Sequence, residues 1–181
     1  MSTQDQRPVA TRIGESLKRT LILSGIALVL SICIALPWGV RAAVASGSAF
    51  DRMTASVLFL LHSMPNFWIA SVLIVLLCGG DYLDIFPAFG WISIDAEHGF
   101  FDAAWHLVLP VLCLLIATVP YLTRHVRSAV LEVLSEEFVK TARAKGLQEQ
   151  KVVWKHTLRN ALIPLITVFA GLLPMLVSGS L

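Results

Sequence analysis

The side chains best suited to chemistry lie in and just after an acidic stretch in the middle of the chain. Asp102 and His106 are four residues apart, a spacing that places two side chains on one face of a helix. Asp95, Glu97 and His98 lie just upstream. Carboxylate and imidazole groups together can coordinate a metal ion. A solvated acidic loop explains the same residues more simply, so we predict that this stretch holds no metal.

Other arrangements that carry chemistry are absent from the sequence. None of the eleven glycines is followed by Lys-Ser or Lys-Thr, so the chain has no phosphate-binding loop of the G-x-x-x-x-G-K-[ST] type. We find no nucleophile–base pair, no zinc spacing of cysteines and histidines, and no nucleic-acid-binding face. We therefore predict a protein that is not an enzyme, with no catalytic residues, no cofactor and no nucleic-acid partner.

The distribution of charge predicts a membrane protein. Of the 181 residues, 56% are hydrophobic and 14% are charged, against roughly 25% charged residues in soluble domains. Four windows without Asp, Glu, Lys or Arg are each about 20 residues long, which is enough to cross a bilayer as a helix. We predict an all-α, polytopic transmembrane bundle with about four spans, near residues 20–40, 55–78, 105–123 and 161–181.

The positions of Lys and Arg predict which side each loop faces. The loop 41–54 and the segment 124–159 together carry ten of them, the arm 1–19 carries four, and the loop 79–104 carries none. The positive-inside rule therefore puts segment 124–159 in the cytoplasm and the loop 79–104 outside the cell. The arm 1–19 then lies outside as well, although Lys18 and Arg19 favour the opposite side. An additional span before residue 1 would resolve that conflict.

The cytoplasmic segment contains a short amphipathic helix, read from the sequence EEFVKTARAKGLQEQ. Ser135 is the expected N-cap and Gly146 the expected C-terminal stop, and a second helix is expected to begin near Gln148. Phe138, Val139 and Ala142 are expected on one face that Gly146 continues. The small residues Ala142 and Gly146 would let another backbone approach closely. A basic loop attracted to lipid headgroups is the plainer interpretation. The small-residue face favours a short helix that docks into a protein partner.

The uncharged windows give weaker indications. His62 and Asn66 are the most polar pair within the uncharged windows, and they are one helical turn apart. A hydrogen bond between helices is the simpler explanation for this pair, and a contact with transported substrate is the alternative. Gly25 and Gly171 are among the small residues that predict close packing of helices.

The sequence EFVKTARAKGL…WKHTLRNALIP resembles the cytoplasmic signature of ABC-importer permeases of the dipeptide, oligopeptide and nickel type. RPVATRIGESLKRTL, HSMPNFWIA and WHLVLPVLCLL…YLTRHVRSAVLEVL resemble further family segments in the same order. Lys140, Thr141 and Ala142 stand where the general pattern has Glu-Ala-Ala. Arg159 stands where that pattern has proline. Both departures fit the peptide-type subfamily.

The resemblance implies a non-catalytic subunit that seats a coupling helix in a cleft of a cytoplasmic ATPase subunit. It also implies a second permease subunit that is a paralogue, an extracytoplasmic substrate-binding protein, and a bacterial or archaeal plasma membrane. Family members begin with an extra span and continue beyond a Gly-Ser like Gly179-Ser180, so we expect the chain to be incomplete at both ends. The coupling residues implied by the resemblance are Glu137, Phe138, Ala142, Arg143, Lys145, Gly146 and Leu147.

Two other functions remain open at this point. A secondary transporter or channel would work without an ATPase, but it would need ionisable groups within the membrane, and the windows contain none beyond His62. A membrane scaffold would use the basic loop only to bind lipid. For an importer, the resemblance makes peptides the leading substrate class and nickel the second. It also implies that selection of the individual substrate lies largely in the separate binding protein.

Overall fold

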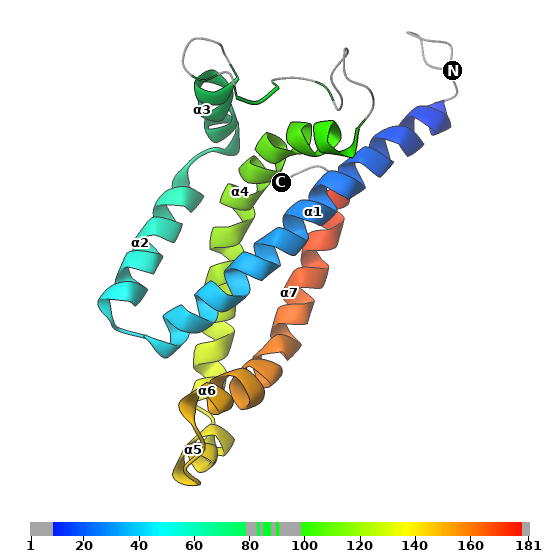
Figure 1. Ribbon diagram of the computed structural model, residues 1–181. Helices are drawn as coiled ribbons and strands as arrows, with labels where there is room; N and C mark the ends of the chain where they lie inside the picture. Colours follow the sequence, from blue (N-terminus) through cyan, green and yellow to red (C-terminus); the bar gives the residue numbers. More distant parts are fainter. Residues whose placement is uncertain (1–8, 79–82, 84, 88–89, 91–98, 179–181) are drawn as a thin grey trace. The chain divides into compact units, whose positions relative to one another are not determined.

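The computed structural model in Figure 1 describes the chain apart from residues 1–8, 79–82, 84, 88–89, 91–98 and 179–181. Every regular element among the described residues is a helix, which confirms the all-α prediction. The elements are α1 (Val9–Val44), α2 (Ala49–Ser63), α3 (Asn66–Leu77), α4 (Phe100–Leu134), α5 (Glu137–Ala144), α6 (Glu149–Lys151), the π-helix η1 (Val152–Thr157) and α7 (Leu158–Ser178).

Two described helices are long and apolar enough to cross a membrane. They are Ser16–Val44 within α1, with a mean hydropathy of 2.4, and Phe100–Leu134, with a mean hydropathy of 2.0. Helices α2 and α3 qualify only as a pair, so the described residues hold two candidate spans, or three if this bent pair is one span. The expected window 55–78 is divided because Pro65 lacks the N–H that a continuous helix needs, and Met64 and Pro65 are both extended. The expected window 161–181 runs beyond α7 into residues outside the described part.

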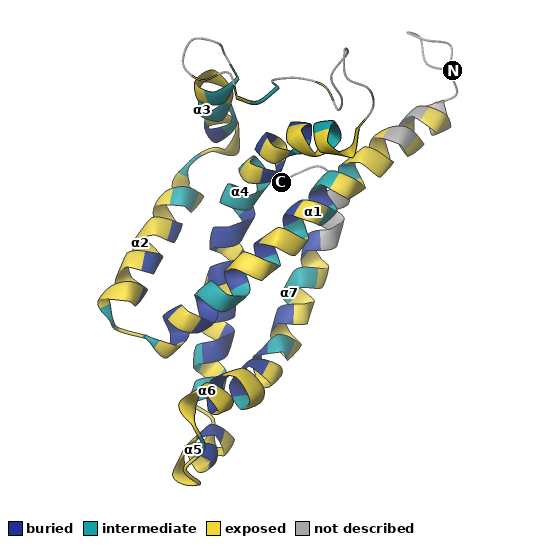
Figure 2. Cartoon of the chain, in the orientation of Figure 1, coloured by how far each residue is buried: buried dark blue, intermediate teal, exposed yellow. Residues whose placement is uncertain are grey.

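The helices divide the chain into two compact units. One comprises residues 1–29, 65–115 and 174–181, and the other comprises residues 30–64 and 116–173. The second unit contains the whole expected cytoplasmic segment, because α4 continues without a break to Leu134 and α5, α6 and η1 follow. Within this unit, Figure 2 shows many buried residues along α4 and mostly exposed ones along α2.

The core of the second unit is formed by α1, α4, η1 and α7. Val40 of α1, Val126 and Val130 of α4, and Leu165 of α7 are at most 1% exposed and belong to one apolar cluster. Most of these side chains are β-branched or small, so neighbouring backbones can approach closely. In contrast, large apolar side chains such as Ile163 are exposed, as expected for a helix face that meets lipid or another protein.

The two helices α1 and α4 approach each other closely at Gly39. A Cβ atom added there would lie 2.7 Å from Cβ of Val126 and 2.9 Å from the carbonyl oxygen of Thr123. Real Cβ atoms do not approach other heavy atoms so closely, so the packing of α1 on α4 requires glycine at this position. By comparison, nothing lies within 4 Å of such an atom at Gly25 or Gly171, where the sequence predicted close packing.

A buried carboxylate ties α2 to α4. Both oxygens of Asp51 accept hydrogen bonds from Arg127, from Nε at 2.7 Å and from Nη2 at 2.8 Å. The backbone N–H of Gly47 donates to the same carboxylate at 2.9 Å. Trp38 adds a bond between α1 and α2, because its indole N–H donates to the hydroxyl of Thr54 at 3.1 Å. These bonds order the turn after α1 and fix the start of α2.

In the first unit, the start of α4 is held by an aromatic contact. The Trp105 ring stacks on Phe86 with centroids 4.6 Å apart, and its N–H donates to the carbonyl of Ile85 at 3.1 Å. Such a ring, with one polar edge and a large apolar surface, is suited to the boundary between membrane and water.

We predict that Gly39→Ala lowers the thermal stability of the full-length protein in detergent, whereas Gly25→Ala leaves it unchanged or raises it. Alanine favours a helix over glycine by about 1 kcal/mol, but at residue 39 the added methyl group must displace Val126 or the Thr123 backbone. Overpacking of this kind costs about 1–3 kcal/mol. Thermal melting of both variants checks this, and equal melting temperatures would contradict the assigned role of Gly39.

Candidate coupling surface

Helix α5 is a single short helix of 8 residues, Glu137–Ala144. Its N-cap residue is Glu136, which makes no side-chain capping bond. The sequence predicted Ser135 for this role, but the Ser135 hydroxyl donates to the carbonyl of Glu132 at 2.7 Å and so belongs to the end of α4. The acidic Glu137 still lies in the first turn, where the helix dipole favours negative charge.

The end of α5 confirms the stop predicted at Gly146. Gly146 has a φ of +77°, in the left-handed region that glycine adopts without strain. Its N–H donates to the carbonyl of Arg143 at 2.9 Å, and the N–H of Leu147 donates to the carbonyl of Ala142 at 3.4 Å. This pair of bonds is a Schellman motif, which turns the chain sharply towards α6. The next helix begins after Gln148, as predicted.

One face of α5 packs against the chain itself. Val139 is 0% exposed and Ala142 is 7% exposed, and both cluster with Val152 of η1. Val133, Leu134 and Leu147 pack around this cluster. The small residue at 142 therefore supports close packing within the chain, and the surface open to a partner is formed by other residues of the helix.

The outer face of α5 is charged, with one large apolar side chain. Phe138 is 43% exposed. Lys140 and Glu137 form an exposed ion pair, with Nζ 2.7 Å from Oε1. Lys145 and Gly146, which follow the helix, are also exposed. An exposed aromatic ring surrounded by charges is a common composition for a protein contact.

Arg143 connects α5 to α6. Its Nη2 lies 2.6 Å from Oε1 of Glu149, and its Nε lies 3.1 Å from Oε2, so the guanidinium grips the carboxylate with two bonds. This contact lowers the pKa of Glu149 and raises that of Arg143, mainly through the hydrogen bonds between them. The pair is exposed and contributes little stability. It does fix the angle at which the turn through Gly146 leaves the helix.

The π-helix η1 was not predicted from the sequence. Its bonding includes the N–H of Leu158 donating to the carbonyl of Val153, five residues back. In an α-helix, residues five apart point about 140° away from each other. The wider π turn brings Val153 and Leu158 to the same side, where both join the core with Val40 and Val126. No residue type in this segment indicates a π turn. We attribute the turn to the packing of Val153 and Leu158 in the same core.

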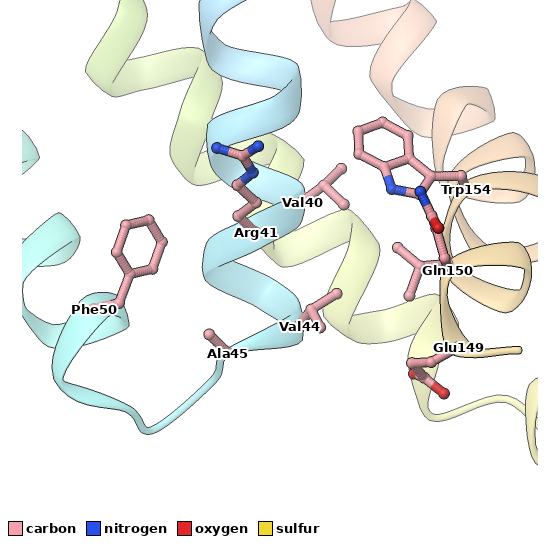
Figure 3. Close-up of a pocket in the computed structure, with 9 residues that line it drawn as sticks. Val40, Arg41, Val44, Ala45, Phe50, Glu149, Gln150 and Trp154 are labelled. Atoms are coloured by element: carbon pink, nitrogen blue, oxygen red, sulfur yellow. The ribbon is translucent and has the colours of Figure 1, made fainter.

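A hollow of about 640 Å³ lies beside η1 (Figure 3). Val40 of α1 and Trp154 of η1 line it, and Glu149 and Gln150 of α6 lie at one edge. Phe50 of α2 completes the apolar lining. With few polar atoms exposed in its wall, the hollow is suited to an apolar group.

The structure separates the polar pair that the sequence placed one turn apart. His62 lies near the end of α2 and Asn66 is the first residue of α3, with the break at Met64 and Pro65 between them. Both side chains are exposed. They are therefore not neighbours on one continuous helix, because the break removes the regular spacing.

Asp102 and His106 do approach each other within α4. His106 Nδ1 lies 3.7 Å from Oδ1 of Asp102 and 2.9 Å from its carbonyl oxygen. No group of three or more metal-binding side chains occurs among the described residues. Asp95, Glu97 and His98 lie outside the part of the chain that the structure describes.

Comparison with known proteins finds relatives among the membrane components of transport systems. Residues 35–181 match the family described as binding-protein-dependent transport system inner membrane component. The chain is 38% identical over 173 residues to the oligopeptide transport system permease protein AppB of Bacillus subtilis (strain 168), covering 96% of this chain and 54% of that protein. It is 41% identical over 177 residues to the di/tripeptide transport system permease protein DppB of Pseudomonas aeruginosa (strain UCBPP-PA14), covering 89% and 53%.

A third relative is the dipeptide transport system permease protein DppB of Escherichia coli (strain K12), 32% identical over 200 residues, covering 100% of this chain and 59% of that protein. The chain thus spans little more than half the length of these relatives. Because the family match extends from residue 35 to residue 181, this chain belongs to the family of binding-protein-dependent transport system inner membrane components.

Proposed function

We propose that this chain is the membrane-spanning part of a permease subunit in an ATP-driven importer, and that α5 is the surface through which an ATPase subunit moves it. The observation that carries the proposal is the division of α5 into two faces. Val139 and Ala142 are buried against the chain's own core, while Phe138 and the charged residues are exposed. A helix built in this way can receive a partner on one side and transmit its movement on the other.

The transmission rests on a shared apolar contact. Val133 and Leu134, at the end of α4, pack against the cluster under α5 and also against the core of α1, α4 and α7. Val152 and Val153 are adjacent in η1, and one belongs to each cluster. Because closely packed interiors deform little, a displacement of α5 also moves α1, α4, η1 and α7. Rocking of packed helices about an interface is a known way of switching a transporter between two openings.

The energy for such a movement must come from a partner. The sequence holds no phosphate-binding loop, so ATP binding and hydrolysis are assigned to cytoplasmic ATPase subunits. Phe138 is the natural anchor in a cleft of that subunit, with Glu137, Lys140 and Lys145 around it. Arg143 is already paired with Glu149, so we assign it to the shape of the turn rather than to a charge contact with the partner. Gly146 and Leu147 set the same turn.

The membrane arrangement follows from the distribution of basic residues. We place segment 124–159 in the cytoplasm and the loop 79–104 outside, in the inner membrane of a bacterium or archaeon. A second, paralogous permease subunit would complete the translocation path, and an extracytoplasmic binding protein would deliver substrate. His62 and Asn66 are candidates for lining that path.

Peptides are the substrate class we propose, with nickel second. The relatives AppB and the two DppB proteins are named as oligopeptide, di/tripeptide and dipeptide transport system permeases. A secondary transporter or channel is the competing function. Affinity purification of the full-length protein separates the two, since stoichiometric recovery of a nucleotide-binding subunit supports the importer, and uptake without such a subunit contradicts it.

We predict that Phe138→Ala weakens binding of the ATPase subunit to the full-length permease. Buried aromatic anchors contribute about 2 kcal/mol or more to protein contacts, which corresponds to about thirtyfold in the dissociation constant. Phe101→Ala is the matched control, because Phe101 is an exposed phenylalanine near the start of α4. Co-purification with titrated ATPase subunit measures both. Unchanged binding of the Phe138 variant would contradict the assigned anchor.

We predict that Gly146→Leu abolishes most of the uptake while the protein still inserts normally, and that Gly146→Asn retains it. A leucine at a φ of +77° is strained by about 1–3 kcal/mol, whereas asparagine tolerates this conformation better. Nothing lies within 4 Å of a Cβ atom at this position, so the effect arises from the backbone and not from a clash. Substrate uptake and membrane yield are compared for the three proteins. Normal uptake by the leucine variant would show that the shape of the turn is unimportant.

A further inference from the structure

A second groove, separate from the coupling surface, runs between α2 and α4. Its volume is about 810 Å³, and its walls combine three arginines with apolar side chains. Arg52 comes from α2, and Arg124 and Arg127 come from α4. Asp51 is its one acidic residue, so the lining carries a net charge of three minus one, or +2.

The arginines differ in how far they are already engaged. Arg127 is bound to Asp51 with two hydrogen bonds, and Arg52 donates to the carbonyl of Gly47 at 2.7 Å. Arg124 is exposed, and no described residue forms a hydrogen bond or ion pair with it. The hydroxyl of Thr123, which also lines the groove, is buried without a hydrogen-bond partner. The Thr123 hydroxyl is too deeply buried to meet an occupant, so Arg124 is the accessible unused donor of a groove with an excess of positive charge.

The chain order of charged and apolar residues is opposite on the two helices, which run in opposite directions (Figure 1), so the charged residues share one end of the groove. On α2 the charged residues come first, and Phe59 and Leu60, which are 67% and 58% exposed, follow two turns later. On α4, Arg124 and Arg127 come directly after the uncharged window 105–123. Basic residues at one end and exposed apolar residues at the other match the order of phosphate and hydrocarbon in a phospholipid.

We propose that this groove binds an anionic phospholipid of the cytoplasmic leaflet, with the headgroup phosphate at Arg124 and Arg52 and an acyl chain along Phe59 and Leu60. Arginine donates two parallel hydrogen bonds to phosphate oxygens, and basic residues at this depth attract anionic headgroups. The Asp51 carboxylate holds Arg127 in place and leaves Arg124 as the free donor. Lipid is favoured over a protein helix because one lipid molecule supplies both the anionic group and the hydrocarbon chain, in the order in which the arginines and the exposed Phe59 and Leu60 lie.

The test uses the full-length protein in lipid nanodiscs of phosphatidylcholine, with and without phosphatidylglycerol, followed by native mass spectrometry of the lipids that remain bound. Wild-type protein is expected to retain phosphatidylglycerol in preference to phosphatidylcholine. Arg124→Gln is expected to retain about fivefold less, from the contribution of one basic residue near an anionic surface. Arg159→Gln, which removes an exposed arginine of α7 outside the groove, serves as the matched control and retains the wild-type amount.

Two further measurements separate the possible occupants. Arg124→Lys keeps the charge and should recover most of the retention, while Leu60→Gln should lower it by weakening the acyl-chain contact. Glycerol phosphate added as a competitor should displace little lipid. Equal retention by Arg124→Gln and the control, or full displacement by glycerol phosphate, would overturn the proposal. A protein segment cross-linked to Phe59 in the full-length protein would overturn it as well.

Discussion

The packing of α5 against the chain's own apolar residues is the constraint on which the rest of the cytoplasmic segment depends. A charged helix of 8 residues is too short to hold its structure in water without tertiary contacts. Val139, Ala142 and Val152 supply those contacts. Once they are made, the exposed face of the helix is fixed relative to the end of α4, and a partner that binds this face also grips the helices behind it.

In the same unit, the residues that make internal contacts differ in chemical type from those on the exposed surfaces. Contacts within the chain are made by small or branched apolar residues, by the glycine at the crossing of α1 and α4, and by the ion pair of Asp51 with Arg127. The exposed surfaces carry arginine, lysine and aromatic rings. Arginine and lysine can bind ligands through directed hydrogen bonds, and aromatic rings can bind proteins through their large apolar area. Internal packing and the open surfaces therefore depend on different residues, and a substitution in one set leaves the other largely intact.

Sequence patterns predicted the local features of this structure well. The stop at Gly146 and the new helix after Gln148 follow from backbone preferences that act over a few residues. The direction in which Ala142 faces was not predictable, because periodicity shows which residues share a face but not what covers it. The contact of Asp51 with Arg127, which are 76 residues apart, and the close approach at Gly39 depend on how distant helices meet. The break at Pro65 has a sequence signal, but a proline within an apolar window is equally compatible with a kink.

The π turn in η1 has a consequence for how the chain can vary. Each residue of a helix sets the angular phase of all that follow it, and the wide turn adds a shift between the part that meets α5 and the part that enters α7. Rewinding Val152–Thr157 as an ordinary α-helix of the same length would rotate Leu158 and Ala161 out of the core by about 100°, whereas loss of one residue together with that rewinding would keep both of them facing the core. The winding of this segment thus sets the rotational alignment between α5 and α7, and it accommodates one additional residue without turning α7 away from the core.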